Sequence, residues 1–369
     1  MTKTALYLEH VNNDAKIIEF AGYLMPVQYK AGIKNEHLWT RNNCGVFDVS
    51  HMGQGILSSD DNSAIEIFLE KITPSDFKNL KEYKAKYTVL TNQDGGIVDD
   101  VIITKISANK FFIVFNAGCK AKDIAWIQKH LPANIKFEVL NERSLIAVQG
   151  PKAETVLQKI FKDSNIDLNK LQYMTLAKSS YNGSEVFISR LGYTGEDGFE
   201  ISVDSKQASH LWQDLTKDKD VMAIGLGARD SLRLEMGYPL YSHDINDNTS
   251  PVAANLKWIL RKDNLDCLGN EKIKQELTTY PEVLRVGISL NDPGIVREDT
   301  KIYNLNKQEI GKVTSGGFGP SCNKAIAQGY VKYEYSKKAT EVLLLLRNNF
   351  IKAEVNALAF TKAKTKTAK

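Results

Sequence analysis

The sequence predicts an α+β body followed by an all-β C-terminal domain. In the body, segments with apolar residues at intervals of three and four, typical of amphipathic helices, alternate with runs rich in β-branched and aromatic residues. Glycine-containing turns separate several of these runs, as in strands joined by hairpins. Beyond a boundary near residues 278–281, Thr-Thr-Tyr-Pro, only short strand-like runs with turns between them remain, which is typical of a small barrel or sandwich.

The individual elements follow from these patterns. Helices are predicted at residues 62–72, 120–130, 153–161 and 207–215. In the body, strands are predicted at residues 86–91 and 97–106, around an Asn-Gln-Asp-Gly-Gly turn, and at residues 185–190 and 199–203, around a second glycine-containing connection. In the C-terminal domain, strands are predicted at residues 285–290, 308–314, 325–331 and 341–346. We therefore expect a body over residues 1–278, a β domain over residues 282–360 and a basic tail over residues 361–369.

The composition is that of a soluble globular protein. With 369 residues, 43% apolar and 25% charged, it excludes collagen, coiled-coil arrays and wholesale disorder. The formal net charge of +4 belongs to the last nine residues, which hold four lysines and no acid. The body is then formally neutral, so a nucleic-acid-binding surface is not supported. The tail is interpreted either as a solvated, disordered segment or as a docking aid for an acidic partner.

The cysteines and the N-terminus indicate a cytoplasmic protein without a metal site. Four cysteines, Cys44, Cys119, Cys267 and Cys322, are widely spaced and form no Cys-x-x-Cys pair or zinc-like pattern, so we expect reduced thiols. The first residues contain neither an apolar signal core nor an arginine-rich presequence. The longest aliphatic run, residues 342–346, is far too short to span a bilayer.

Two adjacent acids, Asp99 and Asp100, are unusual because they lie inside a β-branched strand. Neighbouring strand residues face opposite sides of a sheet, so if either side is packed, one carboxylate is buried or lines a cleft. A buried carboxylate needs a partner or a raised pKa, and such sites are functional candidates. The alternative is an edge strand on which both acids are solvated.

Arg190, Tyr193 and Glu200 surround a glycine-rich loop at residues 192–198. Glu200 alternates with Phe199 and Ile201, and this alternation by itself favours a glutamate that faces solvent.

Residues 225–237 read as a glycine turn that leads into a short helix. Arg229 and Arg233 are four residues apart on one face of this helix and could cradle a carboxylate or phosphate. A surface helix with the pairs Arg229–Glu235 and Asp230–Arg233 is the alternative. The glycines of this segment do not form a nucleotide-binding fingerprint, because Gly225-x-Gly227 lacks the third glycine.

Short motifs along the whole chain resemble one known family in their order and spacing. They are FAGYLMPVQY at residues 20–29, GVFDVSHMG at 45–53, GGIVDD at 95–100, QGP at 149–151, GYTGEDGFE at 192–200, GLGARD at 225–230, RLE at 233–235, a segment at 250–258 and GKVTSG at 311–316. The chain resembles the T-protein of the glycine cleavage system, a tetrahydrofolate-dependent aminomethyltransferase, from about residue 6 to residue 360. The resemblance implies a three-domain fold around a central folate channel, in which the body contains two intertwined α+β subdomains and the last domain is a small β-barrel.

The resemblance also implies the reaction and the partners. A lipoylated H-protein delivers an S-aminomethyl-dihydrolipoyl arm, and the enzyme transfers the one-carbon unit to tetrahydrofolate as co-substrate. Ammonia and 5,10-methylenetetrahydrofolate are released, and the arm is left reduced. Neither nucleic acid nor a membrane is implied as a partner. Because H-proteins of this family are generally acidic, the lysine tail becomes a candidate docking aid.

The resemblance assigns roles to individual residues. Asp100 matches the catalytic acid of the family and is expected to orient the reacting nitrogens and stabilise positive charge at the transferred carbon. Whether it also moves a proton stays open. Glu200 matches the pterin-binding glutamate, because a carboxylate suits adjacent N–H donors, and this reverses the solvent-facing interpretation. Further folate-binding positions are Tyr193, Arg229 and Asn116, with Met52 and Tyr87 as walls of the channel for which simple core packing is an open alternative.

An alternative function is that of a folate-binding protein of the same fold that serves iron–sulfur maturation and is not a transferase. Those relatives carry Lys-Gly-Cys-Tyr-x-Gly-Gln-Glu, whereas the nearest stretch here, residues 266–271, is one residue too short and lacks the lysine. The intact motifs at residues 192–200 and 225–230 favour the transferase. The chain departs from the family at its C-terminus, where residues 359–362 replace an arginine-containing segment.

Overall fold

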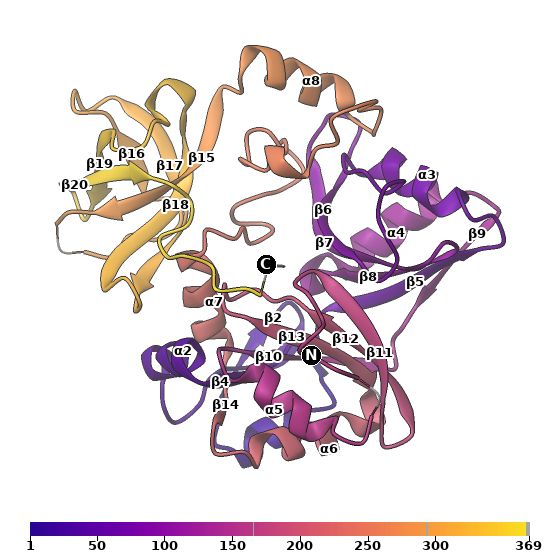
Figure 1. The fold of residues 1–369 in the computed structure, drawn as a ribbon. Helices are drawn as coiled ribbons and strands as arrows, with labels where there is room; N and C mark the ends of the chain where they lie inside the picture. The colour runs from indigo at the N-terminus through magenta and orange to yellow at the C-terminus, as the bar shows by residue number, and fades with distance from the viewer. Residues whose placement is uncertain (165, 293, 367–369) are drawn as a thin grey trace.

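The computed structural model describes residues 1–164, 166–292 and 294–366. The strands of these residues form a three-stranded, a five-stranded and a six-stranded sheet and a closed six-stranded barrel. Figure 1 shows the two larger sheets and the barrel around the middle of the molecule, with the C-terminal segment running from the barrel into this middle. The predicted α+β fold with a C-terminal β-barrel is confirmed. No helix in the described ranges is long and apolar enough to cross a membrane.

The five-stranded sheet is antiparallel and has the order β6-β7-β8-β5-β9. Its strands are β5 (Gly53–Ser59), β6 (Ala85–Thr91), β7 (Ile97–Ser107), β8 (Lys110–Phe115) and β9 (Ile135–Val139). Two helices, α3 (Ala64–Ile72) and α4 (Lys120–His130), pack on one face, and the short η1 (Ala117–Cys119) leads into α4. The bounds of α4 agree with the predicted helix at 120–130, because its apolar residues Ile124 and Ile127 recur on the face that meets the sheet.

Strand β7 is an inner strand of this sheet, since it pairs with both β6 and β8. The edge-strand interpretation of Asp99 and Asp100 is therefore wrong. Val101 and Ile103 belong to the core beneath the helices, whereas Ile102 packs against the core on the opposite face. The alternation places Asp99 on the helix side and Asp100 on the other side.

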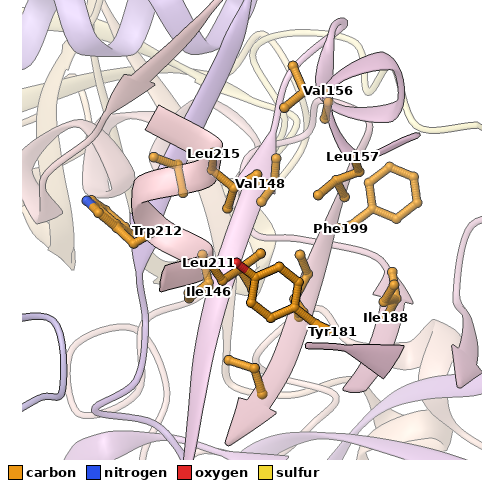
Figure 2. Packing of buried hydrophobic residues seen from close by; sticks show 14 of the residues in the cluster. Ile146, Val148, Val156, Leu157, Tyr181, Ile188, Phe199, Leu211, Trp212 and Leu215 are labelled. Carbon is orange, nitrogen blue, oxygen red and sulfur yellow. The ribbon is translucent and has the colours of Figure 1, made fainter. Parts of the chain in front are cut away.

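The six-stranded sheet has the order β11-β12-β13-β10-β4-β14. Its strands are β4 (Cys44–Asp48), β10 (Arg143–Gln149), β11 (Thr175–Tyr181), β12 (Ser184–Arg190), β13 (Gly198–Asp204) and β14 (Val221–Ala223). Helices α5 (Ala153–Ile160) and α6 (Ser205–Thr216) cover one face. Figure 2 shows Leu211, Trp212 and Leu215 of α6 in this region, and all three belong to one buried cluster with Ile146 and Val148 of β10.

The other face of the six-stranded sheet packs against the five-stranded sheet. Phe187 meets Phe112 edge to face with ring centroids 5.2 Å apart, and Phe47 and Ile56 belong to the same core. Glu200 lies on this face, opposite to Phe199 and Ile201, as the alternation predicts. The face is covered by a second sheet, however, so the expectation that alternation alone places Glu200 in solvent is wrong.

The C-terminal barrel closes in the order β15-β18-β17-β16-β19-β20. Its strands are β15 (Val283–Leu290), β16 (Lys301–Tyr303), β17 (Glu309–Gly319), β18 (Lys324–Lys332), β19 (Glu341–Leu346) and β20 (Asn349–Asn356), with the short η3 (Tyr333–Tyr335). The four strands predicted from the sequence correspond to β15, β17, β18 and β19. Strands β16 and β20 were not predicted. Strand β16 is only three residues long, and in β20 Lys352 and Glu354 interrupt the apolar residues.

The remaining elements connect these units. The N-terminal sheet contains β1 (Thr2–Lys3), β2 (Lys16–Phe20) and β3 (Tyr23–Gln28), beside α1 (Tyr7–Asn12). Helices α2 (Ile33–Asn42) and α7 (Leu226–Glu235) pack on each other, and η2 (Lys257–Ile259) and α8 (Asn270–Thr279) precede the barrel. Between α7 and the barrel, the buried Arg233 bonds Asp244 at 2.7 Å and the Ser315 hydroxyl at 2.9 Å.

The described part of the basic tail lies against the body, so the interpretation of a disordered tail is wrong for residues 361–366. The Lys364 backbone N–H donates to the Gly195 carbonyl at 2.8 Å, and its ammonium group lies 3.1 Å from the buried Glu196. The Lys366 ammonium group lies 2.9 Å from Glu154. Lysine side chains of the tail are therefore held by acids of the same chain.

Truncation after Phe360 is expected to lower the free energy of unfolding by about 1–2 kcal/mol, because two partly exposed ion pairs and the backbone bonds of the tail are lost. Urea unfolding monitored by fluorescence measures this change. The double variant Lys364→Ala/Lys366→Ala should reproduce most of the loss. Lys362→Ala is the matched control, because Lys362 is exposed. Equal stability of the full-length and truncated chains would show that the tail contacts contribute nothing.

Candidate functional site

A cavity of about 890 Å³ lies where the two large sheets, the α7 region and the C-terminal segment meet. A cavity of this size accommodates a ligand with the dimensions of a typical organic cofactor. All seven residues to which the resemblance assigns a role line it: Met52, Tyr87, Asp100, Asn116, Tyr193, Glu200 and Arg229. They come from segments far apart in the sequence, so the fold is required to bring them together.

Asp100 reaches the cavity from the inner strand β7. The Asn116 side-chain amide donates to the Asp100 carboxylate at 2.8 Å. Burial and the neighbouring Asp99 charge raise the pKa of Asp100 to about 7. A carboxyl group with this pKa exchanges its proton near neutral pH, as a general acid or base must.

Tyr87 lies on the same face of the sheet as Asp100, because its neighbour but one, Val89, pairs with Asp100. The Tyr87 hydroxyl is buried and makes no hydrogen bond of ordinary length with the described residues, although it is close enough to Asp100 for that charge, after burial, to raise the pKa of Tyr87. Its ring stacks on Trp258 with centroids 5.5 Å apart and an interplanar angle of 20°. Trp258 is 70% exposed, so this aromatic pair extends from the interior of the cavity to its mouth.

Glu200 and Arg229 supply opposite charges to another part of the cavity wall. Burial raises the pKa of Glu200, and the Arg229 charge opposes this change. Burial lowers the pKa of Arg229, against the influence of Glu200. The Arg229 guanidinium also lies 4.8 Å from the Tyr193 ring centroid, a cation–π contact, and 3.9 Å from the Met52 sulfur. A carboxylate beside an arginine and an aromatic ring is suited to a flat ligand with adjacent N–H donors.

The turn before β13 explains how Tyr193 is aimed at the cavity. Gly195 has φ +77°, a conformation that favours glycine, and a Cβ at this position would clash with the Met236 side chain. The turn therefore packs directly on the segment that follows α7. The Tyr193 hydroxyl donates to the Pro239 carbonyl of the same segment, and the Tyr193 ring stacks on Tyr238 with centroids 5.7 Å apart.

Two predicted site arginines have other roles. Arg190 is buried away from the cavity and bonds Asp197 at 3.0 Å and Glu154 at 2.7 Å. Arg233 is bound by Asp230 and Asp244, so the expected cradle formed by two arginines is wrong, and of the pair only Arg229 lines the cavity. The alternative ion pair between Arg229 and Glu235 is also wrong, because Glu235 pairs with Arg41 and His37.

Glu235 lies at the centre of a separate buried cluster. It is 2.8 Å from Arg41 and 3.2 Å from His37. Hydrogen bonds and charge from His37, together with bonds from Ser321 and Arg41, hold the pKa of Glu235 at about 2.

Several cavity residues were missed by the sequence analysis. Trp258 is the last residue of the motif at 250–258, but the motif alone does not predict that it lines a cavity. Residues 238–241, Tyr-Pro-Leu-Tyr, were not predicted either, although two tyrosines so close together indicate an aromatic wall. His51, for which the sequence leaves a structural and a catalytic role open, also lines the cavity. Burial lowers its pKa to about 4, so it is neutral at pH 7, and its Nδ1 has no partner among the described residues.

Comparisons with known proteins cover nearly the whole chain. Residues 6–264 match the GCVT N-terminal domain, and residues 285–362 match the glycine cleavage T-protein C-terminal barrel domain. The chain is 40% identical to an aminomethyltransferase of Chlorobium limicola over 98% of this chain and 99% of that protein. It is 39% identical to a mitochondrial aminomethyltransferase of Solanum tuberosum over 99% and 91%. The crystal structure of the glycine cleavage system aminomethyltransferase T from Bartonella henselae superposes with a TM-score of 0.93 at 35% identity, covering 99% of both chains.

Proposed function

The chain belongs to the glycine cleavage T-protein family of aminomethyltransferases, and we propose that its cavity binds tetrahydrofolate and receives the aminomethyl-lipoyl arm of an H-protein. In the reaction, the C–S bond to the arm and the C–N bond to the amino group break, two C–N bonds to the folate form, and ammonia and a reduced arm remain. The observation that carries the proposal is that Asp100, with a pKa near 7, shares one cavity with the opposite charges of Glu200 and Arg229.

The residues of the cavity fit a folate. The Tyr87 hydroxyl and His51 Nδ1 are buried polar atoms that lack partners in the described chain, so the cavity offers hydrogen-bonding capacity that a polar ligand would use. We propose that Glu200 accepts hydrogen bonds from the ring N–H and amino groups of the pterin, while Arg229 and Tyr193 hold the adjacent wall. Met52 and Tyr87 would line the channel, and Asn116 would orient Asp100.

Asp100 is proposed as the catalytic residue. An ionised carboxylate beside the transferred carbon stabilises the positive charge that develops as the amino group departs. A pKa of about 7 also allows it to take up or release a proton between steps at neutral pH. Because Asp100 is partly buried in the cavity wall, this charge acts in a medium of lower dielectric than water.

The pH dependence tests this role. If ionised Asp100 is the active form, kcat/KM for ammonia release should rise with pH, with an apparent pKa near 7, and level off above it. The Asp100→Asn variant should lose this limb, whereas Asp94→Asn, an exposed acid of the preceding turn, should keep it. A profile with no titration within about one pH unit of the expected pKa would contradict the proposed role of Asp100.

We further propose that the enzyme works in a reducing compartment, the cytoplasm. The support is that all four cysteines are free thiols and that three of them are buried. The folate-binding protein without transferase activity is not favoured, because the full-length relatives are named aminomethyltransferases.

A further inference from the structure

Asp123, on the side of α4 that faces the five-stranded sheet, is a buried acid that the proposed reaction does not use. Its side chain is fully buried, and neither of its carboxylate oxygens accepts a hydrogen bond from an N–H or O–H donor of the described residues. Asp99 and Cys119, both buried, are its neighbours, and one donor or acceptor atom from each of the three residues lies within 4.8 Å of the others. Asp99 in turn is adjacent to Asp100 in β7.

Two buried carboxylates at this distance cannot both be ionised without a cation. Nothing else would offset the free-energy cost of removing both charges from water and of their mutual repulsion. The nearest cation, Lys122, donates to the Tyr241 hydroxyl and lies 3.1 Å from Asp247, so it is directed elsewhere. One proton is therefore required within the acid pair.

The hydrogen bonds decide which acid carries the proton. Asp99 accepts from the Asn116 backbone N–H at 3.1 Å and from the Asn116 side-chain amide at 3.0 Å, and both bonds favour its ionised form. Asp123 has no such donors, and burial and the Asp99 charge raise the pKa of Asp123 to about 11. Cys119 offers only a thiol, since burial and the same charges raise its pKa.

We propose that Asp123 keeps its proton and donates it to Asp99, and that this buried acid pair acts through Asn116 as a positioning unit for Asp100. The Asn116 amide bonds the Asp99 carboxylate at 3.0 Å and the Asp100 carboxylate at 2.8 Å, so fixing Asp99 fixes the group that orients Asp100. The remaining titratable groups that face the pair are the Cys119 thiol, the Tyr241 hydroxyl and Lys122. The positioning part rests on the proposed role of Asp100, whereas the location of the proton does not.

Infrared spectroscopy of the unliganded, full-length protein locates the proton without any activity measurement. At pH 9, Asp100 is ionised and Asp123 is protonated. The difference spectrum of the native protein minus Asp123→Asn should show a carboxylic acid C=O band at this pH, and the same band should persist in Asp100→Asn. Absence of the band, or its presence unchanged in Asp123→Asn, would overturn the proposal. So would one equivalent of tightly bound metal that Asp123→Asn loses, because the acids would then be ionised.

Kinetics test the positioning role. Asp123→Leu should lower kcat by about 100-fold with little change in KM for tetrahydrofolate, because Asp100 is misplaced while the pocket remains. Asp123→Asn should restore kcat, since an amide replaces the donated hydrogen bond. A native kcat in both variants would contradict positioning by Asp123. An equally lowered kcat in both would contradict it too, because the amide would then fail to replace the donated hydrogen bond. If the native protein itself fails to release ammonia, the proposed function fails, but the infrared result stands on its own.

Discussion

Replacing Asp100 with asparagine is expected to lower kcat for ammonia release by about 10²–10⁴-fold. Asparagine keeps the size of the side chain and can still bond Asn116, but it removes the charge that would stabilise the departing amino group. Binding of tetrahydrofolate should be nearly unchanged, because Glu200 and Arg229 are both intact. The measurement is ammonia release from an aminomethylated H-protein under saturating tetrahydrofolate.

Two other aspartates serve as controls for Asp100→Asn. Asp94→Asn should retain the native rate, because Asp94 is exposed on the turn before β7. Asp99→Asn should cause a much smaller loss than Asp100→Asn, and it should move the apparent pKa of the rate profile down, because the Asp99 charge contributes to the raised pKa of Asp100. An Asp100→Asn enzyme with the native rate would refute the assignment.

Replacing Glu200 with glutamine is expected to weaken tetrahydrofolate binding by about 30–150-fold, which corresponds to about 2–3 kcal/mol for a lost charge-assisted hydrogen bond. The variant also removes the charge that opposes the partly buried Arg229. Isothermal titration calorimetry without H-protein measures the affinity, and the thermal shift on adding tetrahydrofolate should shrink in parallel.

Glu185→Gln, at an exposed position near the start of the neighbouring strand β12, is the matched control and should bind as the native protein does. If Glu200→Gln and Glu185→Gln bind tetrahydrofolate equally well, Glu200 does not contact the pterin. A loss of binding that is accompanied by a lower melting temperature of the unliganded protein would indicate a folding defect. The variant Glu200→Asp, which keeps the charge on a shorter side chain, then shows whether the charge or the length of the side chain is required.

The strands and helices with a strong apolar period could be predicted from the sequence, whereas α2 could not. The buried residues of α2 are Glu36, His37, Thr40 and Arg41, so the face that packs on the protein is polar and gives no hydrophobic period. Arg41 is instead satisfied by Glu235 and Glu196, which are far away in the sequence. Long-range ion pairs of this kind leave no local signal.

The site residues that belong to recognisable motifs could be predicted from the sequence. Those whose place depends on tertiary packing could not. The alternation along β13 correctly separated Glu200 from Phe199, but only the stacking of two sheets converts that face into a cavity wall. For the same reason Arg190 and Arg229 look alike in the sequence, and their partners alone distinguish a buried structural arginine from one that faces the cavity. Asp123 resembles an ordinary acid in the first turn of a helix until the sheet beneath it is known.

The central claim, that this cavity joins the aminomethyl-lipoyl arm to tetrahydrofolate, is tested most directly by the stoichiometry of a single turnover. With the enzyme in excess over aminomethylated H-protein, ammonia and 5,10-methylenetetrahydrofolate should form in equal amounts, and omission of tetrahydrofolate should slow ammonia release strongly. A protein that binds tetrahydrofolate but releases no more ammonia than the H-protein does alone would contradict the account.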